Sequence, residues 1–241
     1  MKLFSDARFS SAVVVAAGLV LGLCAVGVLL KAGIDNFVNK DRSVTVKGLS
    51  EMEVKADHVT WGITTKSVGN DIHELSAKIN EDKGTLVGFL KSNGLEDSDI
   101  VVNPPTMYDK MTDRWGNRET PYRYFATLSM TVSTSKVDVV REIANKVGEL
   151  LEKGIVLSEP EYGESIHYDF INFMSMKPKM MQEAISNAEI TAKQFAESSH
   201  SNIDKIVNAD QGQFSIEDRD ATTPHIKKLR VVSTITYSLK E

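Results

Sequence analysis

The sequence predicts an α+β domain that follows one N-terminal transmembrane helix. Three observations predict it: an uncharged apolar run near the N-terminus, later segments in which apolar and polar residues alternate, and intervening segments in which apolar residues recur every three or four positions. Neighbouring predicted strands with one polar face favour an antiparallel or mixed sheet. About three helices would cover the other face of that sheet, which gives a two-layer domain.

The apolar run at residues 11–30 has the length and composition of a transmembrane helix. Its 20 residues, SAVVVAAGLVLGLCAVGVLL, include no charge. At 1.5 Å per residue such a helix spans about 30 Å, the thickness of the hydrocarbon core of a bilayer. The alternative is a cleaved signal peptide with Lys2 and Arg8 as its basic region. The run exceeds the usual apolar length of about 7–15 residues and no A-x-A site follows it, so an uncleaved anchor is favoured.

The anchor divides the chain into a leader at residues 1–10, the span at 11–30, a polar stalk at 31–42 and a soluble part at 43–241. Basic residues lie on both sides of the span, so their count does not decide its orientation. A short leader before a large domain usually leads to export of that domain. We therefore expect a single-pass membrane protein with a cytoplasmic leader and the soluble part outside the cytoplasm. In a bacterium these locations are the inner membrane and the periplasm.

The composition limits which classes of partner the exported part can bind. The single cysteine, Cys24, lies in the span, so the soluble part forms no disulfide and depends on its hydrophobic core. Residues 31–241 carry 26 Lys and Arg against 32 Asp and Glu, a net charge of −6. An acidic domain is a poor partner for nucleic acid, so none is predicted.

The first half of the soluble part predicts strands around one helix. The predicted elements are strands at 43–48, 57–67, 100–108 and 122–132 and a helix at 70–93. Asp71 and Glu74 form a candidate capping box at the start of the helix, and Gly94 would end it. Pro104 and Pro105 favour an edge position for the third strand because proline cannot donate a hydrogen bond to a sheet.

The second half predicts two helices and two long strands. The predicted elements are a helix from Ser135 to about Gly154, an extended segment at 155–170, a helix at 178–199 and strands at 203–216 and 229–239. A capping box at Ser135 to Asp138 would start the first helix. The apolar stripe of the second helix comprises Met181, Ala184, Ile185, Ala188, Ala192 and Phe195. Because no Pro-, Gly- or Ser-rich linker interrupts residues 43–241, we expect one soluble domain.

Three segments carry a resemblance to a known family. RSVTVKGLSEMEVKADHVTWGITT is similar to its opening pair of strands, NGLEDSDIVVNPPTMYD to its extended segment before a proline and a tyrosine, and LRVVSTITYSLKE to its closing strand. In this order and spacing, the soluble part resembles the SIMPL-domain proteins of bacterial envelopes, which include periplasmic immunogenic proteins and oxidative-stress defence proteins. The likeness covers about residues 43–240. Two departures are Ala56 before Asp57, where the family often has proline, and the retained apolar span.

The resemblance implies a fold and a kind of function but no catalysed reaction. The family fold is a sheet backed by helices, some members form large ring-like or channel-like assemblies, and the family supplies no catalytic residues to transfer. The expected function is therefore a non-enzymatic, membrane-anchored envelope protein that self-assembles into a large ring- or cage-like oligomer and contributes to envelope or oxidative stress tolerance. The alternative is a periplasmic binding module for a peptide, a lipid or an envelope protein.

The residues themselves predict no catalytic site, metal site or cofactor. No His pair has the i,i+4 spacing of a helical metal site, and the motifs of metalloproteases, serine hydrolases, P-loops and dinucleotide-binding folds are absent from the sequence. The acidic cluster at 217–220 lacks the alternating ligands, the glycine and the closing glutamate of a calcium loop. It is expected to be a solvated loop.

Two sets of residues are candidate contact sites. The first interleaves aromatic and arginine side chains, which are enriched at protein interfaces; its members are Tyr108, Arg114, Trp115, Arg118 and Tyr122. The alternative is a local cluster in which Trp115 folds back on its own sheet. The second set is Gly18, Gly22 and Gly27 in the span, where small residues allow close helix packing. Ordinary glycine usage in membrane helices is the alternative for this set.

Overall fold

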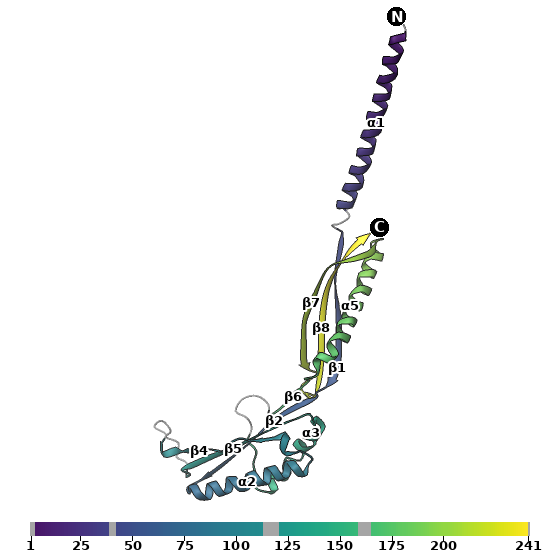
Figure 1. Ribbon diagram of the computed structural model, residues 1–241. Helices are drawn as coiled ribbons and strands as arrows, with labels where there is room; N and C mark the ends of the chain where they lie inside the picture. The colour runs from purple at the N-terminus through teal and green to yellow at the C-terminus, as the bar shows by residue number, and fades with distance from the viewer. Residues whose placement is uncertain (1–2, 39–41, 113–120, 159–164, 241) are drawn as a thin grey trace. The chain divides into compact units, whose positions relative to one another are not determined.

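A computed structural model describes residues 3–38, 42–112, 121–158 and 165–240 of the chain (Figure 1). It confirms the α+β class: an apolar N-terminal helix precedes antiparallel sheets, and the described residues include five α-helices. The chain forms two compact units. The first comprises Met1–Ser50, Lys179–Phe214 and Arg230–Glu241, and the second comprises Glu51–Pro178 and Ser215–Leu229. That residues 43–241 unfold together as one domain stays a prediction.

The first helix, α1 (Leu3–Val38), contains the predicted span. Its apolar window, Val14–Lys31, has a mean hydropathy of 2.4 and is not buried against the rest of the chain. By length and composition this helix can cross a membrane, as an anchor or as a signal sequence. At 1.5 Å per residue its 36 residues measure about 54 Å, so the helix extends beyond the apolar window and includes most of the predicted stalk.

Unit 1 is built on a three-stranded sheet in the order β1-β8-β7. Its strands are β1 (Ser43–Lys55), β7 (Asn202–Asp218) and β8 (Ile226–Lys240). The Leu239 N–H donates to the Arg42 carbonyl at 2.9 Å, and the hydroxyls of Thr45 and Thr236 lie 2.9 Å apart. Residue numbers rise along one strand as they fall along the other, so β1 and β8 are antiparallel.

Helix α5 (Phe173–Ser198) packs against this sheet through alanines (Figure 1). Its buried residues are Met180, Ala184, Ala188, Ala192 and Ala196. The predicted stripe was therefore wrong for Met181, Ile185 and Phe195: Ile185 and Phe195 are exposed and Met181 is half-buried. Alanines line the contact because α5 lies very close to the strands, which leaves no space for larger side chains.

Gly48 shows how close this approach is. A Cβ added at Gly48 would lie 1.8 Å from the Ala184 carbonyl oxygen and 2.8 Å from the Ala188 Cβ. Ser233, on the same face of the sheet, is also small and buried, and its Oγ has no hydrogen-bond partner among the described residues. Small side chains on both surfaces therefore set the spacing between helix and sheet in unit 1.

Unit 2 contains a second sheet with the order β3-β5-β2-β6, and β4 also pairs with β5. Its strands are β2 (His58–Gly69), β3 (Ile100–Val102), β4 (Thr106–Asp109), β5 (Tyr124–Thr134) and β6 (Ile166–Asp169), and all of these pairings are antiparallel. The segment predicted as one strand at 100–108 is thus two short strands separated by its prolines. β3 lies at an end of the sheet, as Pro104 and Pro105 indicated.

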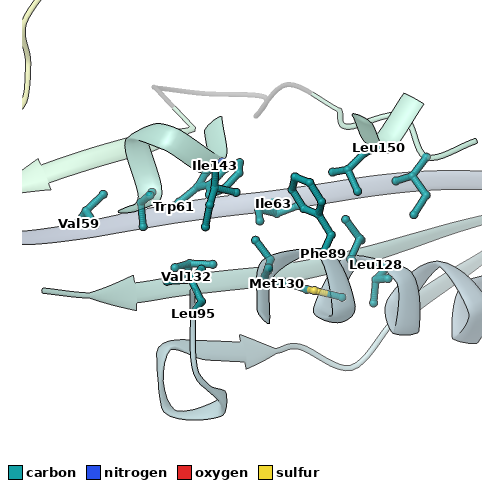
Figure 2. Close-up of a cluster of buried hydrophobic side chains, with 14 of the residues drawn as sticks. Val59, Trp61, Ile63, Phe89, Leu95, Leu128, Met130, Val132, Ile143 and Leu150 are labelled. Atoms are coloured by element: carbon teal, nitrogen blue, oxygen red, sulfur yellow. The ribbon is translucent and has the colours of Figure 1, made fainter. Parts of the chain in front are cut away.

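The core of unit 2 lies between this sheet and three helices, α2 (Ile72–Ser92), α3 (Val137–Asn145) and α4 (Gly148–Glu152). Alternate residues of β2 and β5 point toward the helices, as the sequence pattern predicted. Figure 2 shows the cluster; its labelled residues are Val59, Trp61, Ile63, Phe89, Leu95, Leu128, Met130, Val132, Ile143 and Leu150.

The ends of these helices only partly match the predictions. Asp71 caps α2 by accepting hydrogen bonds from the backbone N–H groups of His73 and Glu74, and Gly94 follows the helix with a φ of 105°. The capping box predicted at Ser135 is wrong: the N-cap of α3 is Lys136, without a side-chain cap bond. Its ammonium group instead pairs with Glu96 and Asp99, which follow α2. The predicted single helix is divided into α3 and α4.

Helix α5 begins at Phe173, five residues before its predicted start at Pro178. The carboxylate of Asp57 fixes the chain just before this start, since it accepts hydrogen bonds from the N–H groups of Ile171 (2.6 Å) and Asn172 (2.9 Å). Burial alone would raise the pKa of Asp57, but these backbone donors outweigh it and lower the pKa below its ordinary value of 3.8.

We expect Gly48→Ala to destabilise unit 1. The added methyl group meets backbone that cannot move aside easily, and overpacking of this kind costs about 1–3 kcal/mol or more. Gly84→Ala in α2 is the matched control, because nothing lies within 4 Å of its added Cβ and alanine favours a helix by roughly 0.5–1 kcal/mol over glycine. Chemical denaturation followed by circular dichroism measures both; equal stability of the Gly48 variant and the wild type would contradict the close approach.

We expect Asp57→Asn to lower the free energy of unfolding by about 1 kcal/mol at pH 7, because an amide has one acceptor oxygen and keeps only one of the two backbone hydrogen bonds. Because the folded pKa of Asp57 is depressed, its stabilisation is present above the unfolded pKa near 3.8 and is lost as the pH falls through the folded pKa. The difference between the wild type and the variant should therefore shrink below about pH 4. Urea denaturation at pH 7 and pH 3 tests this, and a difference that grows at pH 3 would refute it.

Candidate functional site

The predicted aromatic and arginine contact site lies where β4 and β5 meet at one end of unit 2. Arg114, Trp115 and Arg118 fall outside the described residues. Tyr108 in β4 is 46% exposed, and Tyr122, two residues before β5, is 44% exposed. The antiparallel pairing of β4 with β5 brings these two tyrosines to the same end of the sheet. We call the described residues 106–112 and 121–126 the hairpin end.

Polar interactions fix the hairpin end. The guanidinium group of Arg123 donates two hydrogen bonds to the Asp109 carboxylate at 2.7 and 3.1 Å, and its Cζ lies 4.9 Å from the Tyr124 ring centroid. This hydrogen-bonded cation lowers the pKa of Asp109 below its usual value. The Asn70 side chain accepts from the Arg123 N–H at 2.9 Å and donates to the Pro121 carbonyl at 3.0 Å. These interactions hold in place the chain segments from which the two tyrosines project.

Further apolar side chains are exposed around the hairpin end, and the sequence analysis missed them. They are Val68, Ile72, Met107 and Met111. Val68 pairs with Phe125 across the sheet, and Ile72 is the first residue of α2. The only local signal was the pair of methionines flanking Tyr108, since methionine is common at adaptable binding surfaces. Exposed aromatic and methionine side chains on a fixed base suit a protein contact.

The sheet of unit 2 has a second face that carries hydroxyl groups. The residues of β2 and β5 that alternate with the core residues are Thr60, Thr64, Thr127, Ser129, Thr131 and Ser133. Some pair across the strands: the hydroxyls of Thr64 and Ser129 lie 3.3 Å apart, and His58 Nε2 lies 3.0 Å from the Ser133 hydroxyl. The same face also carries charged groups, since Lys66 of β2 lies on it and Asp169 of β6 pairs with His58. It offers many hydrogen-bonding groups.

A small hollow lies at the outer edge of β2, beside α3. Here the Gly62 N–H donates to the Ser165 carbonyl at 2.8 Å and the Ser158 N–H donates to the Thr64 carbonyl at 2.7 Å. The hollow has a volume of about 220 Å³ and is lined mainly by Trp61, Ile63, Ala144, Val147, Leu157 and Ile166. Ligand pockets usually measure about 300–1,000 Å³, so this hollow fits a single side chain rather than a substrate.

Titratable groups do not gather into a catalytic arrangement in the described part of the chain. Those residues include no group of three or more His, Cys, Asp or Glu side chains that could hold a metal ion. His225 contacts the Tyr168 ring, and burial together with nearby Arg141 lowers its pKa. The acidic cluster at 217–220 is only partly a loop, because Glu217 and Asp218 end β7. In the turn that follows, Asp220 accepts hydrogen bonds from Thr222 and Thr223.

The three candidate glycines of the span lie on α1 with open space around them. An added Cβ at Gly18, Gly22 or Gly27 would have nothing within 4 Å among the described residues. In a single chain these glycines therefore contact no other element that the structure describes. Close packing of neighbouring spans through them stays a prediction.

Comparison with known protein families shows which family this domain matches. A family model described as SIMPL, a protein of unknown function (DUF541), matches residues 44–236. The chain belongs to the SIMPL family. The matched region begins in β1 and ends in β8, so it covers strands of both units and confirms the resemblance inferred from the sequence. No curated protein matches the chain.

We expect Asn70→Ala to loosen the hairpin end of this SIMPL domain without unfolding it. The change removes both hydrogen bonds that tie the turn before α2 to residues 121 and 123. Each is worth roughly 0.5–1.5 kcal/mol, so loss of both predicts an increase of about 5- to 150-fold in amide exchange of residues 121–126. Asn103→Ala is the control, because its side chain makes no hydrogen bond to the described residues. Hydrogen exchange measured by mass spectrometry tests this. Equal exchange of residues 121–126 in the two variants would contradict the role assigned to Asn70.

Proposed function

We propose that this protein is a non-enzymatic, membrane-anchored scaffold of the bacterial envelope that self-assembles through its SIMPL domain into a ring- or cage-like oligomer. The family match and the apolar N-terminal helix together indicate an envelope-associated protein. The observation that carries the proposal is the exposed apolar window Val14–Lys31 directly before that domain. Eighteen apolar-rich residues left in water are strongly unfavourable, which a membrane relieves.

Retention of the helix as an anchor supports self-assembly. Anchors confine all copies to one plane and orient them alike, which raises their effective concentration. Weak contacts between soluble parts then become sufficient for assembly, and the glycines of neighbouring spans could pack below them. With the anchor in the inner membrane, the soluble part would lie in the periplasm and contribute to tolerance of envelope or oxidative stress.

The described residues form no catalytic arrangement or metal-binding cluster, which supports a structural role over an enzymatic one. The described residues include no cluster of three or more metal-ligating side chains, the hollow beside β2 is smaller than a typical substrate pocket, and the ion pairs are mostly exposed. The competing proposal is a binding module that captures a peptide, lipid or envelope protein. The exposed tyrosines and methionines of the hairpin end favour it, because such side chains form binding surfaces as well as subunit contacts.

Native mass measurement on the detergent-extracted protein, with electron microscopy of the same sample, tests the proposal. We expect a multi-subunit ring, and a monomer would refute self-assembly. Trp115→Ala should lower the oligomer mass, because aromatic side chains dominate subunit contacts. Phe195→Ala is the control, since it removes an exposed aromatic residue outside the hairpin end. An unchanged mass in the Trp115 variant would remove the hairpin end from the assembly contact while leaving assembly itself intact.

A further inference from the structure

The three-stranded sheet of unit 1 has two outer strands, β1 and β7. The β7 strand is 17 residues long and exposed along most of its length, including Ile206 (54% exposed) and Val207 (62% exposed). Proteins normally shorten, cover or charge such edges, because the outward backbone groups can pair with another strand. A long exposed edge that carries apolar side chains therefore marks a surface for strand pairing.

The side chains next to both edges can be placed on faces of the sheet. Val46 of β1 and Ile203 of β7 belong to the cluster that packs against α5. Because side chains alternate along a strand, Lys47 lies on the opposite face and so does Asp204. Leu49 (40% exposed) follows Lys47 on that face of β1, and Ile206 follows Asp204 on β7.

These two pairs match in chemistry and in spacing. On each strand a charged residue and an apolar residue stand two positions apart, Lys47 with Leu49 and Asp204 with Ile206. Strands β1 and β7 are both antiparallel to β8, so they run in the same direction. If β1 of one copy lies parallel to β7 of another, one register places opposite charges side by side and the apolar residues side by side.

The charges needed for this register are available. Lys47 makes no ion pair with any residue that the structure describes. Asp204 lies 3.5 Å from the Lys240 ammonium group, a long pair between exposed side chains that contributes little. One carbonyl of the β1 edge, that of Leu49, accepts a hydrogen bond from the Asn187 side chain at 2.8 Å. Backbone pairing along β1 therefore depends mainly on Thr45 and Lys47.

We propose that a second copy of this chain docks here, with its β1 edge parallel to β7 of the first copy, Lys47 beside Asp204 and Leu49 beside Ile206. Each copy offers one edge of each kind, so the contact is head-to-tail and closes into a ring when the rotation between copies is a simple fraction of a turn. This inference rests on the self-assembly proposed above and names the surface that produces it. Copies anchored by identically oriented spans present these strands in the same direction.

Charge reversal in the full-length, detergent-extracted chain tests the contact. We expect Lys47→Asp and Asp204→Lys each to lower the oligomer mass in light scattering, because each places like charges together at every contact. The double variant restores opposite charges and should recover the wild-type mass. If the wild type is an oligomer and the single variants keep its mass, the edge contact is wrong and self-assembly stands. If the wild type is a monomer, both proposals fail.

Disulfide trapping in membranes tests the register. The background is Cys24→Ala, which removes the only native cysteine. Leu49→Cys combined with Ile206→Cys should give a ladder of cross-linked dimers, trimers and larger species on mild oxidation. Within one copy β8 separates these positions, so they are at least two strand spacings, about 9.6 Å, apart, beyond the limit of about 7 Å for a disulfide. The ladder can therefore form only between copies.

The matched control replaces Val207 instead of Ile206. Leu49→Cys combined with Val207→Cys puts the second thiol on an adjacent residue that is equally accessible but points to the other face. This pair should give less than a tenth of the cross-linked product. Equal ladders from the two pairs would indicate random collision in the membrane and would overturn the proposed register, as would the absence of any ladder from the first pair.

Discussion

The antiparallel pairing of β2 with β5 organises unit 2. It joins eleven residue pairs, from Val59 with Thr134 to Gly69 with Tyr124. Because side chains alternate, this one register sends Trp61 and Leu128 toward the helices and leaves the threonines and serines on the other face. The same register brings the start of β5 to the turn before α2, where Asn70 holds Pro121 and Arg123. A shift by one residue would exchange the core with the hydroxyl face.

Unit 1 depends on a different constraint, the short distance between α5 and its sheet. Glycine and alanine contribute little apolar area each, so the contact gains from close packing rather than from large side chains. It leaves larger apolar residues of α5, such as Phe195, outside the contact. One helix covers this three-stranded sheet, so few side chains are buried. Among the described residues no further strand pairs with the outer edges of β1 and β7.

The sequence predicted what depends on local pattern and missed what depends on distant residues. Alternation identified β2, β5 and β8, and Gly94 was correctly placed at the end of α2. The start of α5 could not be read locally, because the residues just before it are held by Asp57, 114 residues earlier in the case of Ile171. Phe195 fitted a helical stripe by hydrophobicity, yet the buried face of α5 consists mainly of alanines. At the candidate site, residue type pointed to Tyr108 and Tyr122, whereas the exposure of Met107 and Met111 depends on tertiary packing.

The composition of the β7 edge explains how an exposed strand could be selective. Ile206 and Val207 would pair with almost any apolar strand, but Asp204 and Lys205 directly precede them and Asp210 follows. Charges beside an apolar segment disfavour partners that leave them unpaired or face them with like charge. A partner strand must therefore supply a cation two residues from an apolar side chain, which Lys47 and Leu49 provide. In the proposed assembly each such contact would be weak in solution, but confinement to a membrane plane and closure of a ring would make many weak contacts act together. Selectivity would then come from the edge charges, and strength from the anchor.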